Sequence, residues 1–153
     1  MGNHEEEPGI PHSLVSQYKN FFALSDTFYS FNFQNVHFIV MDSNIPFDTN
    51  SRQYSFVTRD LSNTYRNSSI KWKVVLFHHP IYTSPTEFYK GNDEMRKIYH
   101  PLFDHFGVDL VLQAHNHNYQ RTYPLTYNHS ISDENPIINS YNKTLYAHPS
   151  GEV

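Results

Sequence analysis

The apolar run at residues 108–112, followed directly by Gln113-Ala114-His115-Asn116-His117, most constrains how this chain can fold. A short run of this kind predicts a buried strand, so His115 and His117 are expected where that strand ends in a loop. Alternate side chains of an extended segment share a face, so the two imidazoles are expected to point the same way. That spacing favours a metal site. Because the chain has 11 histidines, a chance pair in a loop is an equal alternative on these residues alone.

The other hydrophobic patterns alternate between the periods of strands and helices. Apolar and β-branched runs predict a hairpin at 27–33 and 36–41, a central strand at 72–77 and a last strand at 144–147. Helical spacing predicts helices at 11–22, at 51–65 with Ser51 as N-cap, and from Asn92 to a stop at Gly107 with a kink at Pro101. The polar segment 127–142 is expected to be a surface loop. Strands that alternate with helices predict an α/β or mixed α+β sandwich.

Composition excludes several classes of protein. The 153 residues fit one domain with a core of its own, and the formal charge of -4 without a long basic run argues against a nucleic-acid surface. The absence of cysteine excludes disulfides, thiolate metal sites and cysteine nucleophiles. No apolar segment reaches the ~20 residues of a membrane span. Any metal must therefore be held by nitrogen and oxygen ligands.

Side chains that can bind metal recur at other junctions of the predicted elements. Asn3 and His4 lie at the start of the chain, and His78 and His79 follow the strand at 72–77. Because sites in α/β sheets assemble at the carboxyl ends of the strands, these groups and the pair after 108–112 are candidates to converge. Imidazoles and a carboxamide without thiolates suit Zn, Fe or Mn.

Three blocks of this sequence resemble a known family. They are Met1-Gly2-Asn3-His4-Glu5, then Val75-Leu76-Phe77-His78-His79-Pro80-Ile81-Tyr82, then Leu112-Gln113-Ala114-His115-Asn116-His117-Asn118-Tyr119-Gln120-Arg121. In that order they resemble the last three motif blocks of the calcineurin-like metallophosphoesterases, and most closely those of the purple acid phosphatases. The resemblance implies a four-layer α-β-β-α sandwich, of which this chain would hold a part that lacks the amino-terminal strands.

The family pattern also implies roles for individual residues. Carried over, it makes Asn3, His78 and His115 ligands of one metal ion and His117 a ligand of a second. His4 would contact the phosphate or the leaving oxygen. The two ions, Fe, Zn or Mn, would support in-line attack of a metal-bound hydroxide on a small phosphomonoester. The family is commonly exported, which favours a secreted protein, and the resemblance implies no organic cofactor.

The chain departs from the family pattern in ways that bear on activity. Ala114 replaces the usual glycine, Gln120 replaces the usual glutamate, and residues 83–95 lack the histidines that handle the leaving group. The Gly-Asp block, whose aspartate bridges the two metals, has no counterpart, since no Gly-Asp pair occurs in the chain. We therefore expect residues 1–153 to be the carboxyl-terminal portion of a phosphoesterase domain, truncated at its front and, since a further strand is expected after Val153, at its far end. Such a portion is expected to have weak or no activity alone.

Other interpretations stay open. A phosphodiesterase or nucleotide hydrolase of the same fold, or a non-catalytic phosphoesterase module, would carry the same blocks. The register of the His-x-Pro block selects His78, so His79 is expected to have no direct role, and Asp42 is expected to stabilise a turn. The remaining histidines are expected on the surface or on helix faces; they are His12, His37, His100, His105, His129 and His148.

Overall fold

A four-stranded sheet organises the residues that the computed structural model describes, which are 1–5, 13–84, 89–130 and 135–142. Its strands are β1 (Tyr29–Phe33), β2 (Val36–Val40), β3 (Trp72–Leu76) and β4 (Leu110–Leu112), in the order β1-β2-β3-β4. β1 is antiparallel to β2, whereas β2, β3 and β4 run parallel. The predicted hairpin and central strand are thus confirmed, and the strand predicted at 108–112 is shorter, since β4 begins at Leu110. The strand predicted at 144–147 lies outside the described residues.

Helices alternate with these strands, which confirms the predicted α/β class. They are the single 3-10 turn η1 (Asn3–Glu5) and the α-helices α1 (Ser13–Phe21), α2 (Arg52–Tyr65) and α3 (Asp93–Phe106). Ser51 caps α2 as predicted, because its Oγ accepts a 3.0 Å hydrogen bond from the amide of Tyr54. Pro101 lies within α3 without ending it.

A left-handed glycine ends α3 and turns the chain into the sheet. Gly107 has a φ of 62°, a conformation that glycine adopts without steric cost. The amide of Val108 donates to the carbonyl of Phe103 at 2.9 Å and closes the last turn. Asp109 then binds the neighbouring strand, since its Oδ2 accepts a 2.7 Å hydrogen bond from the amide of Lys73. The chain therefore passes from α3 directly into β4.

The segment predicted as a surface loop at 127–142 is only partly irregular. β5 (Leu125–Thr126) pairs antiparallel with β6 (Ile137–Ile138), so the loop prediction was wrong at the two isoleucines. Two apolar residues are too few to give a periodic signal. The amide of Tyr127 donates to Oδ2 of Asp104 at 2.6 Å, which ties this small hairpin to α3.

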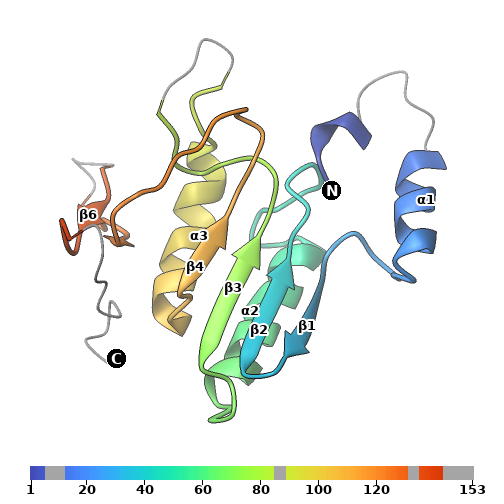
Figure 1. The fold of residues 1–153 in the computed structure, drawn as a ribbon, viewed down its shortest axis with the longest axis horizontal. Coiled ribbons are helices and arrows are strands. Elements are labelled where there is room, and N and C mark those ends of the chain that lie inside the picture. Colours follow the sequence, from blue (N-terminus) through green and yellow to red (C-terminus); the bar gives the residue numbers. More distant parts are fainter. Residues whose placement is uncertain (6–12, 85–88, 131–134, 143–153) are drawn as a thin grey trace.

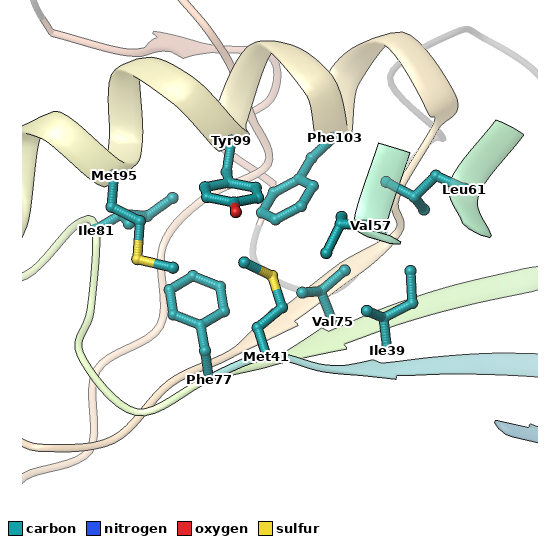
Figure 2. Packing of buried hydrophobic residues seen from close by; sticks show 10 residues of the cluster. All are labelled: Ile39, Met41, Val57, Leu61, Val75, Phe77, Ile81, Met95, Tyr99 and Phe103. Carbon is teal, nitrogen blue, oxygen red and sulfur yellow. The ribbon is translucent and has the colours of Figure 1, made fainter. Parts of the chain in front are cut away.

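The hydrophobic core lies between the sheet and the two long helices. Figure 2 shows Ile39 of β2 and Val75 of β3 in the same cluster as Val57 and Leu61 of α2. The cluster is completed by Met41, Phe77, Ile81, Met95, Tyr99 and Phe103. Burial of a side chain of this size stabilises the fold by about 1.5–3 kcal/mol. The sheet and the helix layer are therefore held together by this cluster.

A polar network joins the β1–β2 hairpin to α2. The imidazole of His37 lies 2.6 Å from Oδ1 of Asn32 through Nδ1 and 2.6 Å from Oδ2 of Asp60 through Nε2. Ser30 donates from Oγ to the other oxygen of Asp60 at 3.0 Å. His37 is buried, which corrects the expectation of a surface histidine. The side chain can be buried because both of its nitrogens have partners.

The other face of the sheet carries only hydrophobic and aromatic side chains. Residues in register share a face, as Phe31, Phe38, Val74 and Leu110 do in one row. The full set, called the open sheet face below, is Tyr29, Phe31, Phe33, Val36, Phe38, Val40, Trp72, Val74, Leu76, Leu110 and Leu112. In Figure 1 both α2 and α3 lie behind the sheet, and Phe33 and Trp72 are 64% and 55% exposed. The helix layer and this sheet are two of the four layers that the resemblance implies.

The parallel strands end together at one edge of the sheet. The amide of Met41 donates to the carbonyl of Leu76 at 2.8 Å, and the amide of Phe77 donates to the carbonyl of Leu112 at 3.1 Å. Pairing therefore continues past the ends of β2 and β3. The turn η1 lies beside these strand ends in Figure 1, so four segments meet there. None of the helices in the described part of the chain is long and apolar enough to cross a membrane.

Candidate metal centre

The segments that follow β3 and β4 are joined through their backbones. The amide of Ala114 donates to the carbonyl of His78 at 3.0 Å, beyond the last paired residues of the two strands. This bond brings the residue after Ala114 to the residue that begins the His-x-Pro block. The sheet register thus places His115 against His78.

Three side chains that are able to bind metal meet at this point. Nε2 of His78 lies 2.7 Å from Oδ1 of Asn3 and 3.1 Å from Nδ1 of His115. The third distance, from Nδ1 of His115 to Oδ1 of Asn3, is 3.3 Å. Residues from three distant parts of the described chain therefore bring one potential ligand atom each to a common point.

The backbone of the second histidine pair is not extended. His115 has a φ of 66°, in the left-handed region that residues other than glycine rarely adopt. Tight turns surround it, since Asn116 donates to the carbonyl of Ala114 at 2.8 Å and Asn118 to that of Asn116 at 2.7 Å. The expectation that His115 and His117 share the face of an extended segment was therefore wrong. His117 is exposed and stands outside the cluster of His78, His79 and His115 in the described residues.

Gly2 and Asn44 hold the amino-terminal turn against the strand ends. The amide of Gly2 donates to Oε2 of Glu5 at 2.8 Å, and Nδ2 of Asn44 donates to the carbonyl of Gly2 at 3.2 Å. A Cβ on Gly2 would lie 3.2 Å from both Cε1 and Nδ1 of His78. Glycine at this position allows the close approach that brings Asn3 to His78. His4 follows in the same turn and is exposed.

The structure adds a side chain that the sequence did not select. Nδ1 of His79 lies 2.8 Å from Oγ of Ser43, which also accepts a 3.0 Å hydrogen bond from the amide of His79. The rings of His79 and His115 are 4.6 Å apart between centroids. His79 is thus a neighbour of His78 and His115, and its sequence signal was its position beside His78 at the end of the strand predicted at 72–77.

Asp42 stabilises the turn that carries Ser43, as the sequence predicts. Its Oδ1 accepts hydrogen bonds from the amide of Asn44 at 3.0 Å and from Nδ2 of Asn44 at 2.9 Å. The buried carboxamide of Gln53 pairs with the Asp42 backbone through bonds of 2.7 and 3.0 Å. The side chain of Gln53 in α2 therefore holds the backbone of this turn in place.

Burial and neighbouring imidazoles favour the neutral forms of His78 and His79. Burial lowers the pKa of His78 below its ordinary value, and the neighbouring His115 lowers it further. Burial, followed by His115 and His78, lowers the pKa of His79 to about 4. Burial also raises the pKa of the Tyr89 phenol, whose ring lies 4.7 Å from that of His115. Neutral imidazoles are the form that binds metal.

Two amide side chains hold the segment after His115. Oε1 of Gln120 accepts hydrogen bonds from Oγ1 of Thr83 at 3.0 Å and from the amide of Ser84 at 2.7 Å. Nδ2 of Asn116 donates to the same Thr83 hydroxyl at 2.6 Å. Gln120, which replaces the usual glutamate, thus supports the loop through neutral hydrogen bonds.

The donor set and its spacing fit a metal ion. Ligand atoms about 2.1 Å from an ion lie about 3.0–3.4 Å apart in octahedral or tetrahedral geometry. The two distances to His115, 3.1 and 3.3 Å, match this spacing, while the 2.7 Å between Asn3 and His78 is a direct hydrogen bond. Two nitrogens and a carboxamide oxygen suit Zn, Fe or Mn.

Comparison with known proteins agrees with this site. The family model described as calcineurin-like phosphoesterase matches residues 1–119. The chain therefore belongs to the calcineurin-like phosphoesterase family. Within that family it is similar to the purple acid phosphatases, as the three sequence blocks predict.

The similarity extends to individual relatives. Purple acid phosphatase 18 of Arabidopsis thaliana is 38% identical over 131 residues, which cover 80% of this chain and 30% of that protein. Purple acid phosphatase 15 of the same plant is 30% identical over 144 residues, covering 89% of this chain and 27% of that protein. The solved structure of purple acid phosphatase PPD1 from yellow lupin (Lupinus luteus) seeds matches with a TM-score of 0.57 at 25% identity, covering 63% of this chain and 18% of that chain. The chain thus spans less than a third of these relatives.

Proposed function

We propose that this chain forms part of a metal-dependent phosphoesterase of the purple acid phosphatase type that hydrolyses a small phosphomonoester. The observation that carries the proposal is the meeting of Asn3, His78 and His115, whose ligand atoms lie 2.7, 3.1 and 3.3 Å apart. These residues belong to the three blocks that resemble the family. Family membership and the geometry of the site therefore support the same chemistry.

In this proposal Asn3, His78 and His115 hold one ion and His117 binds a second, with Fe, Zn or Mn as the candidates. His117 is exposed and does not belong to the histidine cluster found in the described residues, which is consistent with a role at a different ion. The turns around Asn116 separate the two histidines although they are close in sequence.

The residues of the chain bind and orient the substrate. When bound, the metal ions supply Lewis-acid charge to the phosphoryl oxygens and lower the pKa of a water molecule for in-line attack. His4 is exposed next to Asn3, so its imidazole can donate to the phosphate or the leaving oxygen. Gln120 and Asn116 hold the loop that carries His117 through their bonds to Thr83 and Ser84.

We further propose that residues 1–153 supply only part of a phosphoesterase domain and have weak or no activity alone. The histidine cluster in the described residues includes no carboxylate, and a dinuclear centre without an anionic bridge loses much of its charge balance. The share of the relatives that the chain covers, 30% and 27%, supports the same proposal.

The test compares this chain with the full-length product of its gene. Both are analysed for bound metal and for turnover of p-nitrophenyl phosphate, with His78→Ala in each and His105→Ala, exposed on α3, as the matched control. We expect the full-length protein to bind metal and turn over the ester, and the His78 variant to lose both. Full-length protein that binds less than one equivalent of metal and shows no turnover would refute the proposal. Equal activity of the two chains would refute the part that concerns this chain alone.

A further inference from the structure

We infer that His79 is an additional ligand of the ion held by Asn3, His78 and His115, an inference that rests on the proposed metal-dependent function. One ring nitrogen each of His78, His79 and His115 lies within 4.8 Å of the other two. Two ligands bound at about 2.1 Å to one ion lie at most about 4.2 Å apart. Because 4.8 Å is close to this limit, a shift of the His79 ring would bring its nitrogen within reach of the same ion.

Ser43 determines which nitrogen of His79 is free. Its Oγ lies 2.8 Å from Nδ1 and accepts a 3.0 Å hydrogen bond from the His79 amide, so backbone and ring are held by one hydroxyl. Within the described part of the chain, hydrogen bonding of the imidazole goes through Nδ1 alone. When Nδ1–H donates to Ser43, the lone pair of Nε2 is available to a metal. A partner for the second ring nitrogen is the support that metal-binding histidines commonly have.

The surroundings of His79 differ from those of a histidine that only packs in the core. His37 is buried and uses both ring nitrogens in 2.6 Å hydrogen bonds. His79 is partly exposed and uses one. Its ring is 5.8 Å from that of Tyr89 and 4.6 Å from that of His115 between centroids. These rings confine the imidazole beside the other ligands.

A fourth neutral donor also determines which ions the site prefers. Three imidazoles with the carboxamide of Asn3 make a set of three nitrogens and one oxygen. Such a set favours borderline ions such as Zn²⁺ and Co²⁺ over Mg²⁺ and Mn²⁺, which prefer carboxylate and water oxygens. The cluster in the described residues has no carboxylate to offset this preference.

Co²⁺ titration of this chain, followed by visible absorption, tests the inference without any turnover. We expect His79→Gln to raise the Co²⁺ dissociation constant by at least about tenfold, because even residues that only support a ligand change affinity by about 10–100-fold. Ser43→Ala is expected to raise it by about tenfold. His105→Gln, which changes an exposed imidazole on α3, should leave it unchanged. An unchanged dissociation constant in a folded His79→Gln protein would overturn the inference.

X-ray absorption of the Zn²⁺-loaded native chain gives a second readout that does not depend on the folding of a variant. The inference requires the imidazoles of His78, His79 and His115 around the ion, so a spectrum with only two imidazoles would overturn it. The His78→Ala variant separates this inference from the proposed function. If His78→Ala binds Co²⁺ as tightly as the native chain, the metal centre itself is refuted. If only His79→Gln does so, the centre stands without His79.

Discussion

Asn3 and His115 are 112 positions apart in the sequence, yet Oδ1 of Asn3 lies 3.3 Å from Nδ1 of His115. His78, from the middle of the chain, lies against both. An ion bound here links three segments that only the folded chain brings together. Metal binding at this site would therefore be coupled to folding, because the unfolded chain offers no such site.

The first prediction concerns this coupling. Zn²⁺ at 100 times its dissociation constant should stabilise the chain by about 2.7 kcal/mol, because the ion binds the folded state alone. Asn3→Ala should abolish most of this gain while leaving the metal-free protein nearly unchanged, since Asn3 is only partly buried. Urea unfolding with Zn²⁺ and with a chelator measures both quantities. An equal gain in the variant would contradict the prediction.

The second prediction concerns the space around Gly2. A methyl group there would lie 3.2 Å from Cε1 and Nδ1 of His78, which is tighter than ordinary contact. We expect Gly2→Ala to displace the imidazole and lower metal affinity by about tenfold, the lower end of the effect of residues that orient ligands. Calorimetric titration with Zn²⁺ measures the change. Native affinity in the variant would show that the His78 ring can yield to the methyl group at no cost.

The third prediction concerns pH. The pKa of His79 falls from 6.5 to about 4 on folding, because burial and two neighbouring imidazoles disfavour its charged form. The unfolded chain then binds more protons between these values, so the stabilisation is present above pH 6.5 and is lost as the pH falls toward 4. Urea unfolding of the metal-free chain across this range should show the loss. His79→Gln should weaken the pH dependence of the free energy of unfolding relative to native protein, whereas His105→Gln should not.

The fourth prediction concerns the core. Leu61 is fully buried between α2 and the sheet, whereas Leu110 on the open sheet face is 48% exposed. Leu61→Ala should lower the free energy of unfolding by about 2–5 kcal/mol, because it removes buried methyl groups and leaves a cavity. Leu110→Ala is the matched control and should cost clearly less. Comparable losses from denaturant unfolding would mean that the open sheet face is covered in solution.

The fifth prediction separates stability from metal binding. Asp60 accepts hydrogen bonds from His37 at 2.6 Å and from Ser30 at 3.0 Å. Asp60→Ala should destabilise the chain by about 1.5–3 kcal/mol, the usual contribution of hydrogen bonds to a charged group. Zn²⁺ affinity should not change, because neither Asp60 nor its partners belong to the histidine cluster. Asp48→Ala is the control, because the exposed Asp48 carboxylate binds only the amide of Asn50 in the described contacts. It should change the free energy of unfolding by less than about 0.5 kcal/mol.

The strands and helices were predictable where local chemistry determines them. Ser51 and Gly107 mark helix ends because a hydroxyl satisfies free amides and glycine adopts a positive φ without strain. The apolar runs of β2 and β3 were equally plain, since both strands lie inside the sheet. The two-residue strand β6 gave no signal, because its pairing with β5 depends on contacts across a long connection.

The histidine cluster shows where sequence alone was insufficient. The three blocks identified Asn3, His78 and His115 by their resemblance to a family, and the structure brings these side chains together. The left-handed backbone of His115 was not foreseen, because the residue is not a glycine and lies where the chain turns after contacting the segment that follows β3. The place of His79 likewise depends on Ser43, 36 positions earlier in the chain. Contacts between segments, rather than local preference, position both imidazoles.

The open sheet face affects the solubility and self-association of the purified protein. A continuous apolar area of this kind favours association once the protein is concentrated, whatever surface meets it. Light scattering and dye binding should therefore change with protein concentration, and a mild detergent should suppress both. Charged replacements at Phe33 and Trp72, which are exposed there, should improve solubility more than changes elsewhere on the surface. Metal titrations are accordingly best made with dilute protein, where the monomer rather than a colloidal assembly is measured.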